Sequence, residues 1–484
     1  MPPVQNIKEI ADMRTLRALI VCSLLLLVAT PVWGRVFVEW TEPAIPSAAS
    51  LGVKDLVIPW GPGKIHLMNV AKKRGYRVYA LVKPQDAGAT VRNGFAGIIV
   101  EGDSSEPGQG VAQKVVKRLR SSYPGISFLV LDSGGKQPQI RGNLVEKKHG
   151  VLVVSSPTRV PWIDSNVALA RYERAFQSGQ PPLFSFSWEL TDPLEKKEGP
   201  RAEDYALAVA EAGAMHADVI LPVYSNLQKG LAAGDKTAWR EWDRVKRYLS
   251  FYSKASSSKL QSVADVAVVT DHYEDAYEAM NLLARRNLTF RVLAPADVTA
   301  QRLSGSRLAI LFSPPDARAA QALQAFSSAG GTVLVADPHG PSHWEPLHAV
   351  KASNGTSYKI ARGETIDSIQ VVGNPAAFAE KVRNLLHRQG LLIYIWNAVT
   401  TLGFAYHAPQ TGSMVLNLVN YAEEPLQVQV RVKGSFPNIR YETPEHGFYP
   451  PLKPEIDHGF TQFVVSGLKI GARVDLSPQA KQPE

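Results

Sequence analysis

Apolar residues in the first half of the chain gather in short runs, and segments of helical period follow several of them. Runs that are apolar throughout, rather than alternating, are typical of parallel strands buried on both faces. Eight such runs are Val36–Trp40, Asp55–Trp60, Arg77–Val82, Gly97–Glu101, Ser127–Asp132, Val151–Ser155, Leu183–Glu189 and Asp218–Val223. Eight strands joined by helical crossovers predict a (β/α)8 TIM barrel.

The pattern restarts near residue 265 and changes again near residue 403. Strand-like runs alternating with the helical segments Tyr273–Arg286 and Ala317–Ala329 predict a flavodoxin-like doubly wound α/β domain. From Gly403 onward, short alternating strands separated by Gly, Pro and Asn predict a C-terminal β-sandwich. The predicted units are a leader and signal peptide (1–34), the barrel (35–254), the α/β domain (262–395) and the β-sandwich (403–478).

The N-terminal segment has the pattern of a secretory signal peptide. Basic Arg14 and Arg17 precede the apolar run Ala18–Ala29, and Gly34 supplies a small residue for cleavage. The run is short for a bilayer span, so we expect export to a bacterial periplasm or exterior without stable membrane insertion; an uncleaved anchor is the alternative. Cys22 is the only cysteine, so the cleaved chain would hold no disulfide.

The chain carries a formal net charge of +9, from 53 Lys and Arg against 44 Asp and Glu. The densest basic group, at residues 114–120, has helical spacing and is interpreted as a solvated helix face rather than a nucleic-acid site. The export signal also argues against a nucleic-acid partner. Neither a dinucleotide glycine fingerprint nor a P-loop occurs, so we expect no nucleotide cofactor and no other cofactor.

Polar and aromatic residues at the C-terminal ends of the predicted strands are the candidate functional residues, because barrel chemistry takes place there. Two glutamates are the catalytic candidates: Glu101 ends the fourth strand and Glu189 ends the seventh. One carboxyl can carry a proton while the other stays ionised, which glycoside hydrolysis requires. Carboxylates and aromatic rings also bind sugars, and the substrate-binding candidates are Glu39, Trp60, Lys83, Asp103, Asp132, Trp188 and Tyr224.

This arrangement resembles the large superfamily of retaining glycoside hydrolases with (β/α)8 barrels, which places one catalytic glutamate after strand four and another after strand seven. The resemblance implies that Glu101 is the acid/base, that Glu189 is the nucleophile and that the partner is an oligo- or polysaccharide. The order of the three domains is similar to that of family 42 β-galactosidases, whose middle domain helps to form trimers. That similarity implies a homo-oligomer through the α/β domain.

The chain departs from the superfamily pattern at Val100, where asparagine usually precedes the acid/base glutamate. The missing asparagine would hold a sugar hydroxyl, so the alternative is an inactive barrel that binds glycan or mediates assembly. Asp132 could be catalytic instead if the strand count is off by one.

A second polar group is predicted in the α/β domain, where Asp271 and His272 follow one strand and His339 and His343 follow another. Histidine with aspartate can hold a metal. The intervening Gly340–Pro341 favours a loop over the helix that would align both imidazoles, so we predict no metal site.

Overall fold

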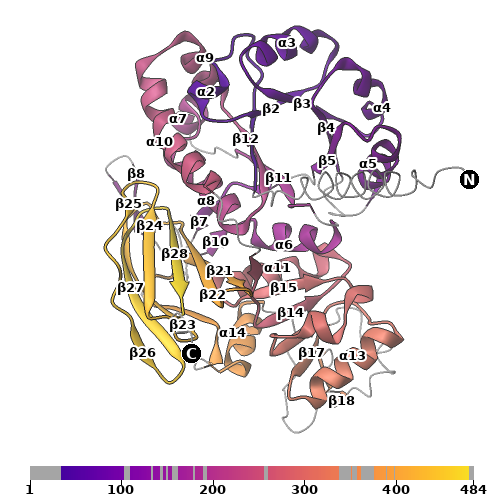
Figure 1. The fold of residues 1–484 in the computed structure, drawn as a ribbon, viewed down its shortest axis with the longest axis vertical. Coiled ribbons are helices and arrows are strands. Elements are labelled where there is room, and N and C mark those ends of the chain that lie inside the picture. Colours follow the sequence, from indigo (N-terminus) through magenta and orange to yellow (C-terminus); the bar gives the residue numbers. More distant parts are fainter. Residues whose placement is uncertain are drawn as a thin grey trace, which may run out of the picture.

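The first domain is a barrel built on a curled, all-parallel sheet (Figure 1). The strand order is β5-β4-β3-β2-β1-β12-β11-β6. These strands are β1 (Val36–Glu39), β2 (Asp55–Pro59), β3 (Arg77–Val82), β4 (Gly97–Glu101), β5 (Ser127–Leu131), β6 (Gly135–Lys136), β11 (Leu183–Ser187) and β12 (Asp218–Pro222). β5 also packs beside β11, which brings the two ends of the sheet together. The predicted TIM-type barrel is confirmed.

The computed structural model describes residues 34–102, 110–131, 135–141, 145–148, 151–154, 162–177, 180–188, 193–254, 260–336, 350–351, 357–360, 375–387, 390–396 and 398–478. In these ranges no helix is both long and apolar enough to cross a membrane. The predicted signal segment lies outside them, apart from Gly34.

Helices cover the outer face of the barrel, as their apolar stripes require. In α5 (Val111–Ser122), for example, Ala112, Val116 and Leu119 are buried at helical spacing while the charged residues face outward. The other helices are α2 (Ala48–Leu51), α3 (Ile65–Lys73), α4 (Ala87–Thr90), α6 (Val167–Phe176), α7 (Pro193–Glu198), α8 (Ala202–Met215), α9 (Ser225–Ala233) and α10 (Lys236–Ser253).

The barrel interior is a packed core rather than a channel. Its buried side chains form one cluster: Phe37, Val57, Tyr79, Ile99, Leu129, Leu131, Leu183 and Ile220. Below this layer, at the N-terminal ends of the strands, Arg35 pairs with Asp218 and Arg77 pairs with Asp55, each at 2.7 Å. Because side chains alternate along a strand, the next inward layer lies at the opposite, C-terminal mouth.

The sixth strand differs from the prediction. Val151–Val154 (β9) forms an antiparallel pair with Val145–Lys148 (β8) outside the barrel sheet. The sixth place is taken by β6, which pairs with β11 and follows β5 almost directly. An apolar run predicts a strand but not its partner, and a two-residue strand beginning at glycine has no apolar run to detect. A second hairpin-like pair, β7 (Gln139–Arg141) with β10 (Trp162–Asp164), leads back toward α6.

The second domain is the predicted doubly wound α/β unit. Its sheet order is β15-β14-β16-β17-β19-β18, parallel over the first four strands. The strands are β14 (Val266–Val269), β15 (Phe290–Leu293), β16 (Leu308–Leu311), β17 (Thr332–Ala336), β18 (Val350–Lys351) and β19 (Ser357–Ile360). Helices α11 (Tyr273–Arg285) and α14 (Pro375–Leu385) pack side by side on one face of this sheet, with α11 next to the barrel helix α6, and α12 (Ala300–Leu303) and α13 (Ala317–Ser328) lie on the other face (Figure 1).

The third domain is the predicted β-sandwich. One antiparallel sheet has the order β13-β21-β22-β28-β24-β25 and the other β20-β23-β27-β26. The strands are β13 (Gln261–Ser262), β20 (Ile393–Trp396), β21 (Thr401–Ala408), β22 (Ser413–Asn420), β23 (Leu426–Lys433), β24 (Asn438–Thr443), β25 (Gly447–Phe448), β26 (Glu455–Asp457), β27 (Phe460–Leu468) and β28 (Gly471–Ser477). Inward residues of both sheets form one core. Ser262 of β13 and Ile393–Ile395 of β20 lie within the range 262–395 that the sequence assigns to the α/β domain.

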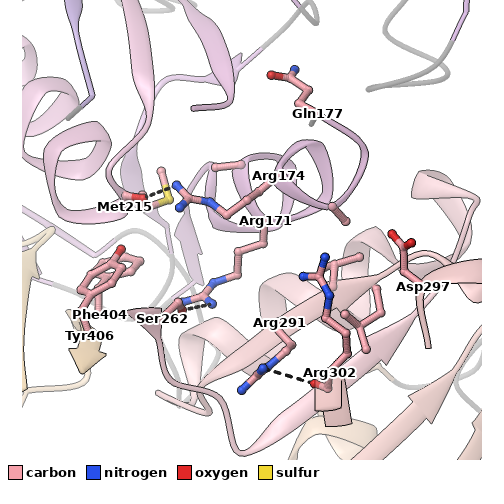
Figure 2. Close-up of a pocket in the computed structure, with 14 residues that line it drawn as sticks. Arg171, Arg174, Gln177, Met215, Ser262, Arg291, Asp297, Arg302, Phe404 and Tyr406 are labelled. Atoms are coloured by element: carbon pink, nitrogen blue, oxygen red, sulfur yellow. Dashed lines mark hydrogen bonds between the residues drawn. The ribbon is translucent and has the colours of Figure 1, made fainter. Parts of the chain in front are cut away.

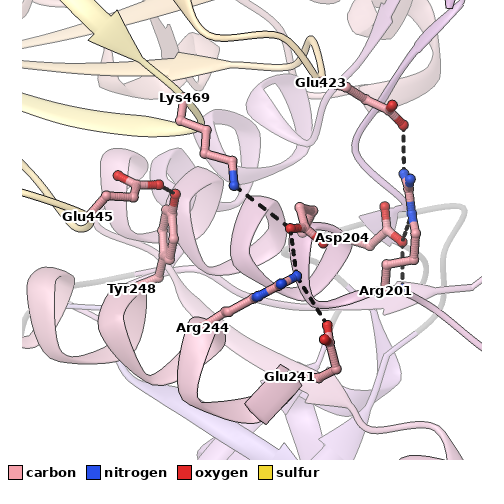
Figure 3. Close-up of polar contacts among 9 residues, drawn as sticks. Arg201, Asp204, Glu241, Arg244, Tyr248, Glu423, Glu445 and Lys469 are labelled. Atoms are coloured by element: carbon pink, nitrogen blue, oxygen red, sulfur yellow. Dashed lines mark hydrogen bonds and ion pairs between the residues drawn. The ribbon is translucent and has the colours of Figure 1, made fainter. Parts of the chain in front are cut away.

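The three domains share a continuous apolar core that runs from the barrel through the α/β sheet to β21 and β22. Buried hydrogen bonds cross it: the Tyr406 hydroxyl donates to the Ala214 carbonyl at 2.8 Å, and the Tyr172 hydroxyl donates to the Asp271 carbonyl at 2.7 Å. Ion pairs at the rim also join barrel and sandwich, including Arg201 with Glu423 (Figure 3). The shared core and these polar contacts together hold the barrel against the other two domains, through α6, α8 and α10.

Candidate active site

Two glutamates point into the mouth of the barrel from opposite parts of its sheet. Glu39 follows the interior residue Phe37 by two positions at the end of β1, and Glu101 follows Ile99 by two at the end of β4. Alternation along a strand therefore directs both carboxylates into the layer above the packed interior. Both are half-buried.

Burial and the neighbouring Glu101 change the acidity of the Glu39 carboxyl. The pKa of Glu39 is raised above its ordinary value, first by burial and then by the negative charge of Glu101. Both effects penalise the ionised form of Glu39. One carboxyl at the mouth thus holds its proton more firmly than a free glutamate, beside a second carboxylate. This is the division of roles that acid-assisted chemistry needs.

Trp60 and Lys83 follow the next two strands. Trp60 is half-buried and meets the ring of Phe95 edge to face, with centroids 5.5 Å apart. Lys83 is exposed, and its carbonyl accepts a turn hydrogen bond from the Asp86 amide at 3.0 Å. Trp60 is therefore partly committed to packing, whereas the Lys83 side chain faces solvent.

Trp188 and Tyr224 fix the opposite rim. The indole of Trp188 donates to the Pro222 carbonyl at 2.6 Å and lies nearly parallel to Phe186. The Tyr224 hydroxyl donates to the Lys196 carbonyl at 2.6 Å. Both polar groups are thus used in holding the loops after β11 and β12, and only the partly exposed ring surfaces are left for a ligand.

Three of the predicted site residues, Asp103, Asp132 and the catalytic candidate Glu189, lie outside the described residues. The structure therefore brings together Glu101 and Glu39 and leaves the Glu101 to Glu189 pairing a prediction. Sequence reasoning placed Glu39 among the substrate-binding candidates and kept it as a reserve for the catalytic pair Glu101 and Glu189. Its position at a strand end was visible, but its burial and its coupling to Glu101 depend on barrel curvature.

A polar network around Gln228 on α9 was not predicted. Its side-chain oxygen accepts from the amides of Thr41 and Glu42 at 2.9 and 3.1 Å, and its amide nitrogen donates to the Val223 carbonyl at 2.6 Å. The Glu42 carboxylate accepts from the Ser225 hydroxyl at 2.7 Å. This network joins the loops that follow β1 and β12, and thereby supports the end of the strand that carries Glu39.

The histidines of the α/β domain fall partly outside the described residues, which exclude His339 and His343. His272 is exposed, and its Nε2 lies 3.7 Å from the Oδ1 of Asp271. Within the described ranges, no group of three or more His, Cys, Asp or Glu side chains could hold a metal ion.

No protein-family model matches the chain, and no curated protein matches it in sequence. Solved structures do match. Alpha-L-fucosidase isoenzyme 2 from Paenibacillus thiaminolyticus is 11% identical with a TM-score of 0.59, over 92% of this chain and 99% of that one. An exo-carrageenase GH42 from Bacteroides ovatus is 11% identical with a TM-score of 0.39, over 86% of this chain and 54% of that one. The similarity to the fucosidase shows a shared fold.

The predicted resemblance to glycoside hydrolases with TIM-type barrels is thus confirmed at the level of fold. Fold alone does not establish chemistry, because one barrel architecture hosts many reactions. The function has to be argued from the residues at the mouth.

Proposed function

We propose that the protein is a glycosidase that cleaves an oligo- or polysaccharide at the mouth of the barrel. The observation that carries this proposal is the pair of inward-facing carboxylates Glu39 and Glu101, one of which has a raised pKa. The fold that the chain shares with an alpha-L-fucosidase supports it.

In the proposed reaction, Glu39 gives its proton to the glycosidic oxygen as the bond from that oxygen to the anomeric carbon breaks. The ionised Glu101 attacks the anomeric carbon and forms a glycosyl ester. Water then attacks the same carbon, gives a proton to Glu39 and releases Glu101 as a carboxylate. Two displacements retain the anomeric configuration. The alternative assignment, taken from the family resemblance, makes Glu101 the acid/base and Glu189 the nucleophile.

The test is a screen of purified protein against aryl glycosides and polysaccharides, with Glu39→Gln, Glu101→Gln and Glu189→Gln beside it. Loss of a carboxylate that acts in acid, base or nucleophilic catalysis lowers kcat by about 10²- to 10⁴-fold. We expect this for Glu39→Gln and Glu101→Gln. Glu241→Gln, on the outer helix α10, is the matched control and is expected to keep full activity.

NMR identifies the anomer that forms first, and this anomer shows whether the reaction retains or inverts the configuration at the anomeric carbon. If Glu189→Gln abolishes turnover while Glu39→Gln does not, the family assignment replaces ours. Turnover that survives both Glu39→Gln and Glu101→Gln contradicts either version.

A second candidate function is glycan binding without cleavage. It is favoured by Val100, which is fully buried against the helical layer and offers no polar group beside Glu101. Saturable glycan binding with no turnover on any substrate would support it. We also propose export, on the basis of the N-terminal sequence pattern; N-terminal sequencing of protein recovered from outside the cytoplasm tests cleavage near Gly34.

A further inference from the structure

A cavity of about 540 Å³ lies where the three domains meet, away from the barrel mouth. Helix α6 of the barrel forms one side, the segment from β15 to α12 of the α/β domain forms another, and β21 of the sandwich closes a third (Figure 2). Phe404 and Tyr406 are its buried aromatic wall.

The charged residues that line this cavity are four arginines, Arg171, Arg174, Arg291 and Arg302, and one aspartate, Asp297. None of the ion pairs formed among the described residues includes one of these arginines. Among the described residues that line it, the cavity therefore holds an excess of positive charge.

Their hydrogen bonds go mostly to backbone oxygens. Arg174 donates to the carbonyls of Met215 and His216 at 2.8 and 3.1 Å, and Arg291 donates to the Arg302 carbonyl at 3.2 Å. Arg171 donates to the Phe290 carbonyl and, at 3.4 Å, to the Ser262 hydroxyl. The Nε groups of Arg171 and Arg291 are buried and find no acceptor among the described residues.

The positive charges of these arginines also repel one another. The pKa of Arg171 is lowered to about 10, first by burial, with the positive charges of Arg174 and Arg291 contributing and the Tyr406 hydroxyl acting in the opposite direction. Burial and then Arg302 lower the pKa of Arg291. Clustering cations in this way costs free energy unless an anion lies between them.

We infer that this cavity is a binding site for a small oxyanion ligand with two phosphate-type groups. The arginines form two pairs on facing elements, Arg171 and Arg174 on α6 and Arg291 and Arg302 in the α/β domain, so a ligand with two charged groups can engage both. Guanidinium groups bind phosphate oxygens through charge-assisted, often bidentate hydrogen bonds. Such a ligand would join the barrel to the α/β domain.

The experiment measures binding of inorganic pyrophosphate to the full chain by calorimetry at low ionic strength, with sulfate and chloride for comparison. We expect saturable binding with the highest affinity for pyrophosphate, a lower one for sulfate and the lowest for chloride. The affinity for pyrophosphate should fall as salt is added. Each charge-assisted hydrogen bond contributes about 1.5–3 kcal/mol, so Arg174→Gln and Arg302→Gln should each weaken pyrophosphate binding roughly tenfold or more. Both side chains are largely exposed, which favours normal folding of the variants.

Arg318→Gln is the matched control, because Arg318 is exposed on α13 of the same domain and does not line the cavity. It should bind pyrophosphate as the unaltered protein does. A measurement that needs no variant is arginine modification by phenylglyoxal, mapped by mass spectrometry: pyrophosphate should protect Arg174 and Arg302 but not Arg318. Absence of saturable pyrophosphate binding, or equal protection of all three arginines, would overturn the proposal.

Discussion

Glu211 is a carboxyl placed where water cannot reach it. It lies on α8 and is fully buried, and it accepts hydrogen bonds from the amide and the side chain of Asn166 at 3.0 and 2.7 Å and from the Tyr421 hydroxyl at 2.7 Å. Burial raises its pKa from 4.5 to about 7, and these hydrogen bonds limit the rise. A single side chain thus connects barrel and sandwich and makes the stability of the contact depend on pH.

The folded state binds the Glu211 proton more tightly than the unfolded chain, so stability falls as pH rises. Its contribution is complete below about pH 4.5 and is lost by about pH 7, an effect on the order of 3 kcal/mol. We predict that Glu211→Gln flattens the decline of the thermal midpoint between pH 5 and pH 8. Glu198→Gln, an exposed glutamate on α7, should leave the profile unchanged. A Glu211→Gln profile as steep as that of the unaltered protein would contradict the assignment.

At the scale of single elements, the short strand β6 depends on side-chain hydrogen bonds that a longer strand would not need. The Asn166 side chain accepts from the Lys136 amide at 2.7 Å and donates to the Lys136 carbonyl at 2.9 Å. The Asn166 side chain therefore pairs with β6 as a neighbouring strand would. The backbone amide and the side-chain amide of Asn166 also donate to the Glu211 carboxylate. Gly135 is required because a Cβ there would lie 2.4 Å from the Ser185 carbonyl oxygen.

We predict that Asn166→Ala destabilises the protein by roughly 2–4 kcal/mol, because it removes both hydrogen bonds to Lys136 and leaves the buried Glu211 carboxylate short of donors. Urea unfolding at fixed pH measures the change. Asn93→Ala is the control, since Asn93 is half-buried and its side-chain amide donates only a long, solvent-exposed hydrogen bond, at 3.5 Å, to the Ala89 carbonyl. If Asn166→Ala lowers the free energy of unfolding no more than Asn93→Ala does, β6 does not depend on Asn166.

Most elements could be predicted from the sequence because a strand that is buried on both faces requires a continuous apolar run, as in Val266–Val269. β6 could not, because its position is fixed by Asn166 and β11 rather than by its own residues. Within the site, strand ends identify Glu39 and Glu101, but the effect of the Glu101 charge on the pKa of Glu39 depends on curvature that brings β1 and β4 to a common mouth. The four arginines of the junction cavity come from two domains, so no local pattern unites them.

At the scale of the whole molecule, close packing rather than surface charge holds the sandwich on the barrel. The rim ion pairs of Figure 3 that join the two domains, such as Arg201 with Glu423 at 2.7 Å, are largely exposed, and exposed pairs contribute about 0–1 kcal/mol. Tyr252 on α10 is instead buried between the domains. A Cβ on Gly471, at the start of β28, would lie 2.5 Å from the Tyr252 hydroxyl and at an ordinary 3.4 Å from Ala210.

We predict that Gly471→Ala destabilises the protein by about 1–3 kcal/mol, because the added methyl collides with the hydroxyl of the buried Tyr252. The collision involves only the hydroxyl, which has no hydrogen-bond partner among the described residues. Tyr252→Phe should therefore be neutral or stabilising by itself and should remove most of the Gly471→Ala penalty, a coupling that a double-mutant cycle measures directly. Gly63→Ala, whose Cβ would meet nothing within 4 Å, is the control. Additive effects of the two substitutions would show that the domains do not meet at Tyr252 as closely as this contact requires.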